Sequence, residues 1–255
     1  MAMEINLRGK KALVTGGSGG LGRKIVRTLA ECGADVAIHY HSDRENAESL
    51  VCELKEMNRE AAAFRADVTS MDSVFRMRDE MADSFGMPDI VVANAVIQYD
   101  RKRLLEQDVE AYYSQYESCV MQMVYLAKAF VPHMQEQQYG RIAVINTECS
   151  IAAEPDFSAY VAAKRGLDGI VRVLVKEVGP DNITINQIAP GWVITDKERQ
   201  SGVCAAGAYE ESVPLRRRGC DQDIANMVAF LVSDLASFTT GAFIPVAGGR
   251  VMPSI

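Results

Sequence analysis

Short apolar runs alternate with longer amphipathic stretches along the whole sequence. Short apolar runs bounded by turn residues predict buried strands, and apolar residues three or four positions apart predict helices. The predicted strands are Lys11–Thr15, Asp35–His39, Ala61–Phe64, Asp89–Ala93, Arg141–Ile145, Thr184–Ile188 and Phe243–Val246, and the predicted helices are Leu21–Cys32, Arg44–Met57, Met71–Phe85, Asp108–Gln137, Ser158–Glu177 and Asp221–Leu231. Strands that are apolar throughout and separated by helices form a parallel sheet covered on both faces. The sequence therefore predicts an α/β fold, a doubly wound parallel sheet of the Rossmann type with about seven strands.

No linker rich in Pro, Gly and Ser divides the 255 residues, and no internal repeat occurs. The length is ample for one α/β domain, so we expect residues 1–255 to form a single domain. Doubly wound sheets bind ligands beyond the carboxyl ends of their strands. The loops that follow the strands are therefore where functional residues are expected.

The formal net charge is −7 and the sequence pI is near 5.1. This balance argues against nucleic acid or an anionic membrane as a partner, because both attract basic surfaces. No apolar run approaches the ~20 residues that span a bilayer, and the first residues do not resemble a signal peptide. We therefore expect a cytoplasmic protein whose six cysteines stay reduced. The three histidines are scattered and no CxxC pair occurs, so no metal site is expected.

A glycine-rich segment, Thr15-Gly16-Gly17-Ser18-Gly19-Gly20-Leu21-Gly22, joins the first predicted strand to the first predicted helix. Glycines allow a tight turn and close approach of a ligand, and a helix N-terminus adds free N–H groups and partial positive charge. A flexible turn is the alternative, but the position between strand and helix favours a dinucleotide site. The residues expected to bind the cofactor here are Gly16, Ser18, Gly20, Leu21 and Gly22.

The spacing Thr-Gly-x3-Gly-x-Gly, together with Tyr160-x3-Lys164, resembles the short-chain dehydrogenase/reductase family, and further matches extend over nearly the whole chain. Tyr160 and Lys164 share one helix face. A free tyrosine has a pKa near ~10, and a neighbouring ammonium group lowers it by stabilising the phenolate. The resemblance implies that Tyr160 transfers a proton and that Lys164 lowers its pKa and binds the nicotinamide ribose. Thr147, thirteen residues before Tyr160, replaces a serine that orients the substrate carbonyl.

The resemblance implies further cofactor contacts after other strands. Asp67 and Val68 match an adenine-contacting pair, and Asn94 and Ala95 match part of the family's Asn-Asn-Ala-Gly. A later segment matches the one that holds the nicotinamide amide, and its expected contacts are Pro190, Gly191, Val193 and Thr195. Residues around 195–214 are expected to form a lid over the substrate.

Some positions depart from the family's pattern. Val96 replaces a glycine near the cofactor, Ala247 replaces an aspartate, and Cys119 stands where the family has a catalytic asparagine that holds a proton-relay water. A thiol is a weak donor and acceptor, so Cys119 is a poor substitute or simply a packing residue. Glu148, directly after Thr147, is either a solvated carboxylate or a pocket group that binds substrate hydroxyls or a cation. We include Glu148 and Val96 as candidate substrate residues.

NAD-preferring relatives carry an acidic residue at the end of the second strand, where this chain has Tyr40. Without that acid a 2′-phosphate is not repelled, and His41, Ser42 and Arg44 are placed to bind it. Many NADP-preferring relatives also carry a basic residue where this chain has Gly19. The mixed pattern favours NADP(H), with NAD(H) as the alternative.

The pattern is most similar to that of 3-oxoacyl-carrier-protein reductases, which dock an acidic carrier through arginines. Gln138 and Asp181 stand at those positions, which argues against an acyl carrier protein as partner. We therefore expect an NADP-preferring oxidoreductase that transfers hydride between the nicotinamide and a small carbonyl compound or secondary alcohol. Glu148 suggests a sugar acid or a polyol, and the resemblance implies a homotetramer.

Two other functions stay open. A cofactor-binding protein with vestigial catalysis, a sensor or an assembly subunit, is favoured by Cys119, Val96 and Ala247. It is opposed by the retained Tyr160 and Lys164, because a binding module needs no activated tyrosine. A non-redox isomerase or dehydratase on this fold would form product without a net change in nicotinamide absorbance.

Overall fold

In the computed structural model, which describes residues 4–202 and 207–253, seven strands form one sheet in the order β3-β2-β1-β4-β5-β6-β7. The strands are β1 (Lys11–Val14), β2 (Asp35–Tyr40), β3 (Ala61–Arg65), β4 (Ile90–Ala93), β5 (Gly140–Ile145), β6 (Ile183–Pro190) and β7 (Phe243–Val246). Each neighbouring pair runs parallel. The strand order changes direction at β1, with β2 and β3 on one side and β4 to β7 on the other, which confirms the predicted doubly wound sheet.

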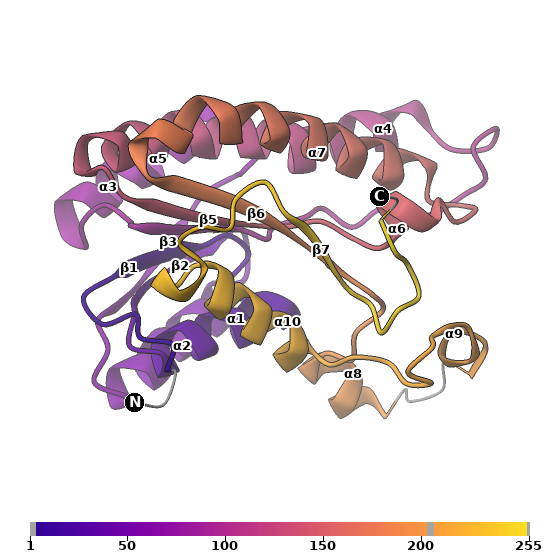
Figure 1. Cartoon of the computed structure of the whole chain (residues 1–255), viewed down its shortest axis with the longest axis horizontal. Coiled ribbons are helices and arrows are strands. Elements are labelled where there is room, and N and C mark those ends of the chain that lie inside the picture. The colour runs from indigo at the N-terminus through magenta and orange to yellow at the C-terminus, as the bar shows by residue number, and fades with distance from the viewer. Residues whose placement is uncertain (1–3, 203–206, 254–255) are drawn as a thin grey trace.

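Helices cover both faces of the sheet (Figure 1). One layer contains α1 (Gly20–Glu31), α2 (Arg44–Glu56) and α10 (Asp221–Leu231), and the other contains α3 (Met71–Ser84), α4 (Val109–Tyr116), α5 (Gln122–Gln137) and α7 (Ser158–Val178). The core divides in the same way, because successive strand residues point to opposite faces. Ala12 and Val14 belong to one buried cluster, and Leu13 between them belongs to the other.

The helix predicted over Asp108–Gln137 is interrupted. α4 ends at Tyr116, a π-helical turn spans Glu117–Met121, and α5 continues from Gln122. One wider turn leaves the spacing of apolar residues on either side nearly intact, so the sequence pattern does not reveal it. Turns of this kind are frequent at functional sites, and this one contains Cys119.

Short helices also occur between the longer elements. They are α6 (Cys149–Ala152), α8 (Asp196–Ser201) and α9 (Gly207–Ser212), together with 3-10 turns at Gly179–Asp181 and Asp234–Ala236. α8 and α9 fall within the expected lid, and residues 203–206 of that lid lie outside the described residues. Elements this short carry too few residues for a periodic pattern, which is why the sequence does not predict them.

Three findings concern only the described part of the chain. None of its helices has the length and hydropathy needed to cross a membrane. Five cysteines are free thiols, and Cys204 falls in the segment that is not described. No group of three or more His, Cys, Asp or Glu side chains is arranged to hold a metal ion in these residues.

Candidate active site

The loops that follow β1, β4, β5 and β6 meet at one edge of the sheet, on the right of Figure 1. Parallel strands end at the same edge, so residues far apart in the sequence come together there. The glycine loop follows β1, Asn94 follows β4, Thr147 follows β5 and Gly191 follows β6.

The glycine loop leads into an open helix N-terminus. Gly19 is the N-cap of α1, no side chain of the described residues caps the helix, and its first turn contains no acidic residue. Gly19 and Gly20 are exposed, so the backbone of this turn is open to solvent. Free N–H groups and the positive end of the helix fit a pyrophosphate. This end of α1 is thus suited to the phosphates of a dinucleotide.

Thr15 at the end of β1 fixes the glycine loop to two other segments. Its hydroxyl accepts hydrogen bonds from the backbone N–H groups of Asn94 (2.9 Å) and Ala95 (3.0 Å) and donates to Gln122 Oε1 (2.9 Å). The Asn94 amide donates to the Thr15 carbonyl oxygen at 2.8 Å, and Gln122 donates to Ala95 O at 2.9 Å. The predicted residues Asn94 and Ala95 therefore support the loop directly. Gln122 was not predicted, because one amide on an amphipathic helix carries no distinguishing signal.

His39 supports the same loop from β2. Its Nδ1 accepts a hydrogen bond from the Gly16 N–H at 2.9 Å, so its Nε2 carries the proton and donates to Ala66 O at 3.1 Å. Burial lowers the pKa of His39 to about 4, although the bond to Ala66 opposes this shift. The imidazole is neutral at physiological pH and links β1, β2 and β3. A histidine inside an otherwise apolar strand was the only sequence signal for it.

Protonation of His39 is expected to make the fold less stable in mild acid. The unfolded chain takes up this proton near the ordinary value of 6.5, whereas the folded state does so only near 4. The unfolded state therefore binds more protons in between, and the free energy of unfolding falls by up to about 3 kcal/mol as pH drops from 6.5 to 4. Urea unfolding of the wild type and of His39→Gln across this range tests the effect. His133→Gln serves as the control, and identical pH slopes for all three proteins would contradict the assignment.

Thr147, Tyr160 and Lys164 come together at the same edge of the sheet as the glycine loop. Thr147 follows β5, while Tyr160 and Lys164 lie one turn apart near the start of α7. The Thr147 and Tyr160 side chains are hydrogen-bonded. The Lys164 ammonium group lies 5.6 Å from the centroid of the Tyr160 ring and donates to Ile145 O at 2.7 Å. Thr147 and Lys164 are buried, whereas Tyr160 is half-buried.

The pKa of Tyr160 is shifted in the opposite direction from the one expected. Burial raises it, and the hydrogen bond from Thr147 only partly opposes this effect. Lys164 does not reverse the shift, because its ammonium group is engaged by the Ile145 carbonyl and burial lowers the pKa of Lys164 itself. The Tyr160 hydroxyl therefore holds its proton at neutral pH, as a proton donor to a carbonyl requires.

Cys119 lies beside these groups. Its π-helical turn packs against α7, its side chain is buried, and its thiol is hydrogen-bonded to Lys164, where it raises the lysine's pKa against the effect of burial. A sulfur atom thus occupies the place beside the lysine where the family resemblance puts an asparagine.

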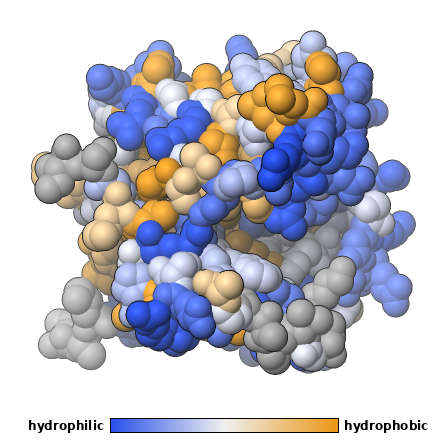
Figure 2. Space-filling view, turned by 90° about the vertical axis from the view of Figure 1, so that its right-hand side faces the viewer, coloured by the Kyte–Doolittle hydropathy of each residue, from blue (hydrophilic) through white to orange (hydrophobic). Residues whose placement is uncertain are grey.

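A cavity of about 490 Å³ opens beyond Tyr160. Its lining residues are Arg101, Thr147, Glu148, Cys149, Glu154, Phe157, Tyr160, Pro190, Gly191, Trp192, Tyr209 and Arg250. Figure 2 shows this side of the molecule, which is hollowed and bordered by both hydrophilic and hydrophobic residues. Val96, expected near the substrate, is half-buried and does not line the cavity.

Glu148 is only 3% exposed, which excludes the solvated alternative. Its Oε1 accepts a hydrogen bond from the Tyr209 hydroxyl at 2.8 Å and lies 3.2 Å from an Arg250 guanidinium nitrogen. Burial raises the pKa of Glu148, and these two contacts oppose the shift. Tyr209 comes from α9 and Arg250 from the segment after β7. The sequence does not predict either residue, because only the folded chain brings these segments to β5.

The expected 2′-phosphate site is only partly open. Tyr40 packs in the hydrophobic core, whereas His41, Ser42 and Arg44 are exposed. Arg65 Nε donates to the His41 carbonyl oxygen at 3.1 Å, which adds a cation at this end of the sheet.

At the expected adenine site, Asp67 accepts two hydrogen bonds from Thr69, at 2.9 and 2.6 Å, and these bonds lower the pKa of Asp67. The neighbouring residue Val68 is buried.

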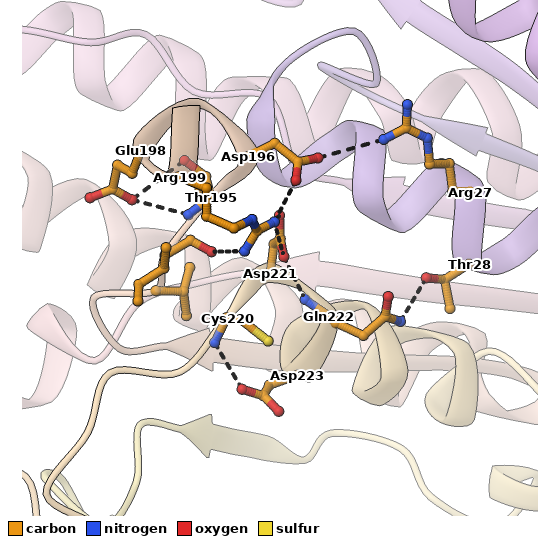
Figure 3. Close-up of polar contacts among 12 residues, drawn as sticks. Arg27, Thr28, Thr195, Asp196, Glu198, Arg199, Cys220, Asp221, Gln222 and Asp223 are labelled. Atoms are coloured by element: carbon orange, nitrogen blue, oxygen red, sulfur yellow. Dashed lines mark hydrogen bonds and ion pairs between the residues drawn. The ribbon is translucent and has the colours of Figure 1, made fainter. Parts of the chain in front are cut away.

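Ion pairs hold the base of the expected lid against two helices (Figure 3). The Arg199 guanidinium group on α8 contacts Asp221, at the start of α10, at 2.7 and 2.9 Å. It also contacts Asp196 at 2.5 Å, and Asp196 lies 3.5 Å from an Arg27 nitrogen on α1.

Thr195 forms a capping box with Glu198 at the start of α8. This network places Thr195 beside the glycine loop, where its Cβ lies 3.5 Å from the position of a Cβ built on Gly20. Val193, just before it, is buried.

Comparison with known proteins agrees with this geometry. The family model described as Enoyl-(Acyl carrier protein) reductase matches residues 16–250. A 3-oxoacyl-[acyl-carrier-protein] reductase of Staphylococcus epidermidis is 35% identical over 249 residues, which cover 95% of this chain and 99% of the relative. A solved NAD+-bound xylitol dehydrogenase has a TM-score of 0.89 and 28% identity, covering 95% of this chain and 99% of its own. A gluconate 5-dehydrogenase of Burkholderia cenocepacia, in complex with NADP and tartrate, has a TM-score of 0.89 and 26% identity, covering 97% of each chain.

Proposed function

Because the chain belongs to the short-chain dehydrogenase/reductase family, whose members exchange hydride between a nicotinamide cofactor and a carbonyl or alcohol, we propose that it is an NADP-preferring reductase of small polar carbonyl compounds. It also catalyses the reverse reaction, the oxidation of an alcohol. Residues 1–255 act as one domain. The observation that supports this best is the meeting of Thr147, Tyr160 and Lys164, of which Thr147 and Tyr160 line the cavity, at the sheet edge that carries the glycine loop.

When bound, the nicotinamide supplies the hydride for reduction. Tyr160 gives its retained proton to the substrate oxygen, and the Thr147 hydroxyl donates a hydrogen bond that holds the same oxygen in place. Lys164 holds the nicotinamide ribose and keeps a positive charge behind the phenolate that forms. The glycine loop at the start of α1 holds the pyrophosphate, and the segment Pro190–Thr195 holds the nicotinamide amide.

A polyhydroxylated substrate, a sugar acid or a polyol, fits the cavity better than a carrier-bound acyl chain. The cavity is lined by charged groups and by the aromatic rings of Phe157 and Trp192. Two solved relatives are a xylitol dehydrogenase and a gluconate 5-dehydrogenase. At the surface where a carrier protein is expected to dock, Asp181 accepts hydrogen bonds from Gln135 and Gln138, at 2.6 and 3.2 Å, so this surface presents a carboxylate instead of arginines.

We also infer a homotetramer, as the family resemblance implies. Large apolar side chains are exposed on α4 and α7 and near β7, the elements through which relatives associate. They include Val109, Tyr113, Tyr116, Val173 and Phe238. A dimer or tetramer would cover them, and light scattering of the purified protein measures the assembly directly.

Binding of reduced cofactors, followed by their fluorescence, tests the proposed preference. We expect NADPH to bind more tightly than NADH, and Arg44→Gln to weaken NADPH binding by about 3–10-fold while leaving NADH unchanged, because only NADPH carries the 2′-phosphate. Lys55→Gln removes the same charge from the far end of α2 and should change neither affinity. Equal losses for both cofactors in Arg44→Gln would contradict the phosphate contact.

Turnover with a panel of ketones, ketoses and polyols separates the remaining functions. Oxidation or reduction coupled to nicotinamide absorbance supports the reductase. Tight cofactor binding without turnover of any compound would favour a binding protein with vestigial catalysis. Product formation without net absorbance change would favour an isomerase or dehydratase.

A further inference from the structure

Only one oxygen of the buried Glu148 carboxylate is satisfied. Oε1 contacts the Tyr209 hydroxyl at 2.8 Å and Arg250 at 3.2 Å. Oε2 is buried and has no hydrogen-bond partner among the residues that the structure describes. A buried acceptor without a donor is costly, and more so when it carries charge. A ligand that brings a hydrogen-bond donor to this oxygen removes the cost.

Glu148 stands where it can select substrates. It follows Thr147 directly in the chain, and both residues line the cavity with Tyr160. Adjacent residues have Cα atoms about 3.8 Å apart. A substrate whose reacting oxygen is held by Thr147 and Tyr160 therefore brings the neighbouring carbon, and any group on it, close to Glu148. Oε2 is buried in the present arrangement. A rotation of the carboxylate toward the cavity brings Oε2 within reach of a group on that neighbouring carbon.

The charges around Glu148 favour a neutral donor. Arg250 lies between Glu148 and Glu154 and pairs with both, and its Nε donates to Ser212 Oγ at 3.0 Å. Each of its three guanidinium nitrogens thus already has a partner, and the two flanking carboxylates neutralise its charge, which disfavours binding of a substrate carboxylate beside Glu148. A substrate cation bound to Glu148 is repelled by the positive charge of Arg250. A substrate anion is repelled by the carboxylates of Glu148 and Glu154. A hydroxyl group carries no charge and donates one hydrogen bond.

We propose that Glu148 is a specificity-determining residue whose carboxylate accepts a hydrogen bond from a hydroxyl on the carbon next to the reacting one. The preferred substrates are then α-hydroxy ketones or aldehydes in reduction and vicinal diols in oxidation. Tyr209 and Arg250 position the carboxylate by holding its other oxygen. This inference rests on the proposed reductase function.

Reduction of 3-hydroxybutan-2-one and of butan-2-one tests the proposal, because the two ketones differ only in the adjacent hydroxyl. The quantity to compare is the ratio of their kcat/KM values, since general damage to the site lowers both values alike. We expect the wild type to favour the hydroxy ketone. Glu148→Met, which removes the acceptor, should lower the ratio by about 10-fold or more, and Glu148→Gln, which keeps the size, by about 3–10-fold.

Glu154→Gln is the matched control, since it removes the other carboxylate partner of Arg250 and leaves the Glu148 acceptor in place. It should leave the ratio within about 2-fold of the wild type. Unchanged ratios in both Glu148 variants would overturn the proposal. So would a wild type that does not distinguish the two ketones.

Ligand binding separates failure of this inference from failure of the proposed function. Thermal stabilisation of the complex with NADP+ is measured with butane-2,3-diol, butan-2-ol and 3-aminobutan-2-ol. Stronger stabilisation by the diol that is lost in Glu148→Met supports the inference even if no ketone is turned over, in which case only the reductase function fails. Stronger stabilisation by the amino alcohol would overturn it in favour of a cation site.

Discussion

Tyr160→Phe is expected to lower kcat/KM for carbonyl reduction by about 10²–10⁴-fold, the usual contribution of a positioned proton donor. The substitution removes the hydroxyl oxygen and keeps the aromatic ring of this α7 residue. Neither remaining group replaces this proton donor, because the Thr147 alcohol is a much weaker acid than a phenol and the Lys164 ammonium group is engaged by the Ile145 carbonyl. Initial rates with saturating NADPH and the best ketone of the panel measure the loss.

The control for this substitution is Tyr99→Phe. The Tyr99 hydroxyl belongs to the same region, where it accepts a hydrogen bond from the Tyr160 backbone N–H at 3.4 Å, but it has no place in the proton transfer. We expect a loss of less than about 3-fold from it. Both variants should bind NADPH as the wild type does, which shows that the site is intact. Full turnover by Tyr160→Phe would remove Tyr160 as the proton donor.

The sheet was predictable because most of its strands are largely apolar runs between amphipathic helices. β4 shows this most clearly, since each of its residues is apolar and buried. The π-helical turn at Glu117–Met121 was not predictable, because the apolar residues of α4 and α5 keep a helical spacing on either side of it. The spacing of apolar residues shows which face of a helix is buried, but it does not reveal one additional residue in a single turn.

The candidate site likewise contains residues that local sequence patterns predict and residues that they do not. Tyr160, Lys164 and the glycine loop follow from local spacing and from their positions after β1 and β5. Tyr209 and Arg250 do not, because nothing local to either residue marks it as a partner of Glu148. The direction of the Tyr160 pKa shift was missed for a related reason. It depends on how completely the folded chain excludes water, and the four-residue spacing from Lys164 gives no measure of that.

Gly22→Ala is expected to destabilise the fold by at least about 3 kcal/mol and to abolish cofactor binding. A Cβ at this position falls 2.1 Å from the carbonyl oxygen of Gly16 and 3.0 Å from the Asn94 amide nitrogen. The first of these is a backbone atom at the start of the loop, so relief requires the loop to move away from α1. For a chain of this length, that loss corresponds to a melting temperature lower by about 6–12 °C. Thermal unfolding and NADPH fluorescence measure the two effects.

Gly19→Ala distinguishes this steric effect from a general sensitivity of the loop. A Cβ on Gly19 lies 3.5 Å from the same Gly16 oxygen, an ordinary contact, and its φ of −89° suits any residue. We expect Gly19→Ala to keep both the melting temperature and the affinity for NADPH close to those of the wild type. If Gly22→Ala unfolds and binds NADPH as the wild type does, the glycine loop does not pack against α1 as described. The assignment of the pyrophosphate to the start of that helix would then fail with it.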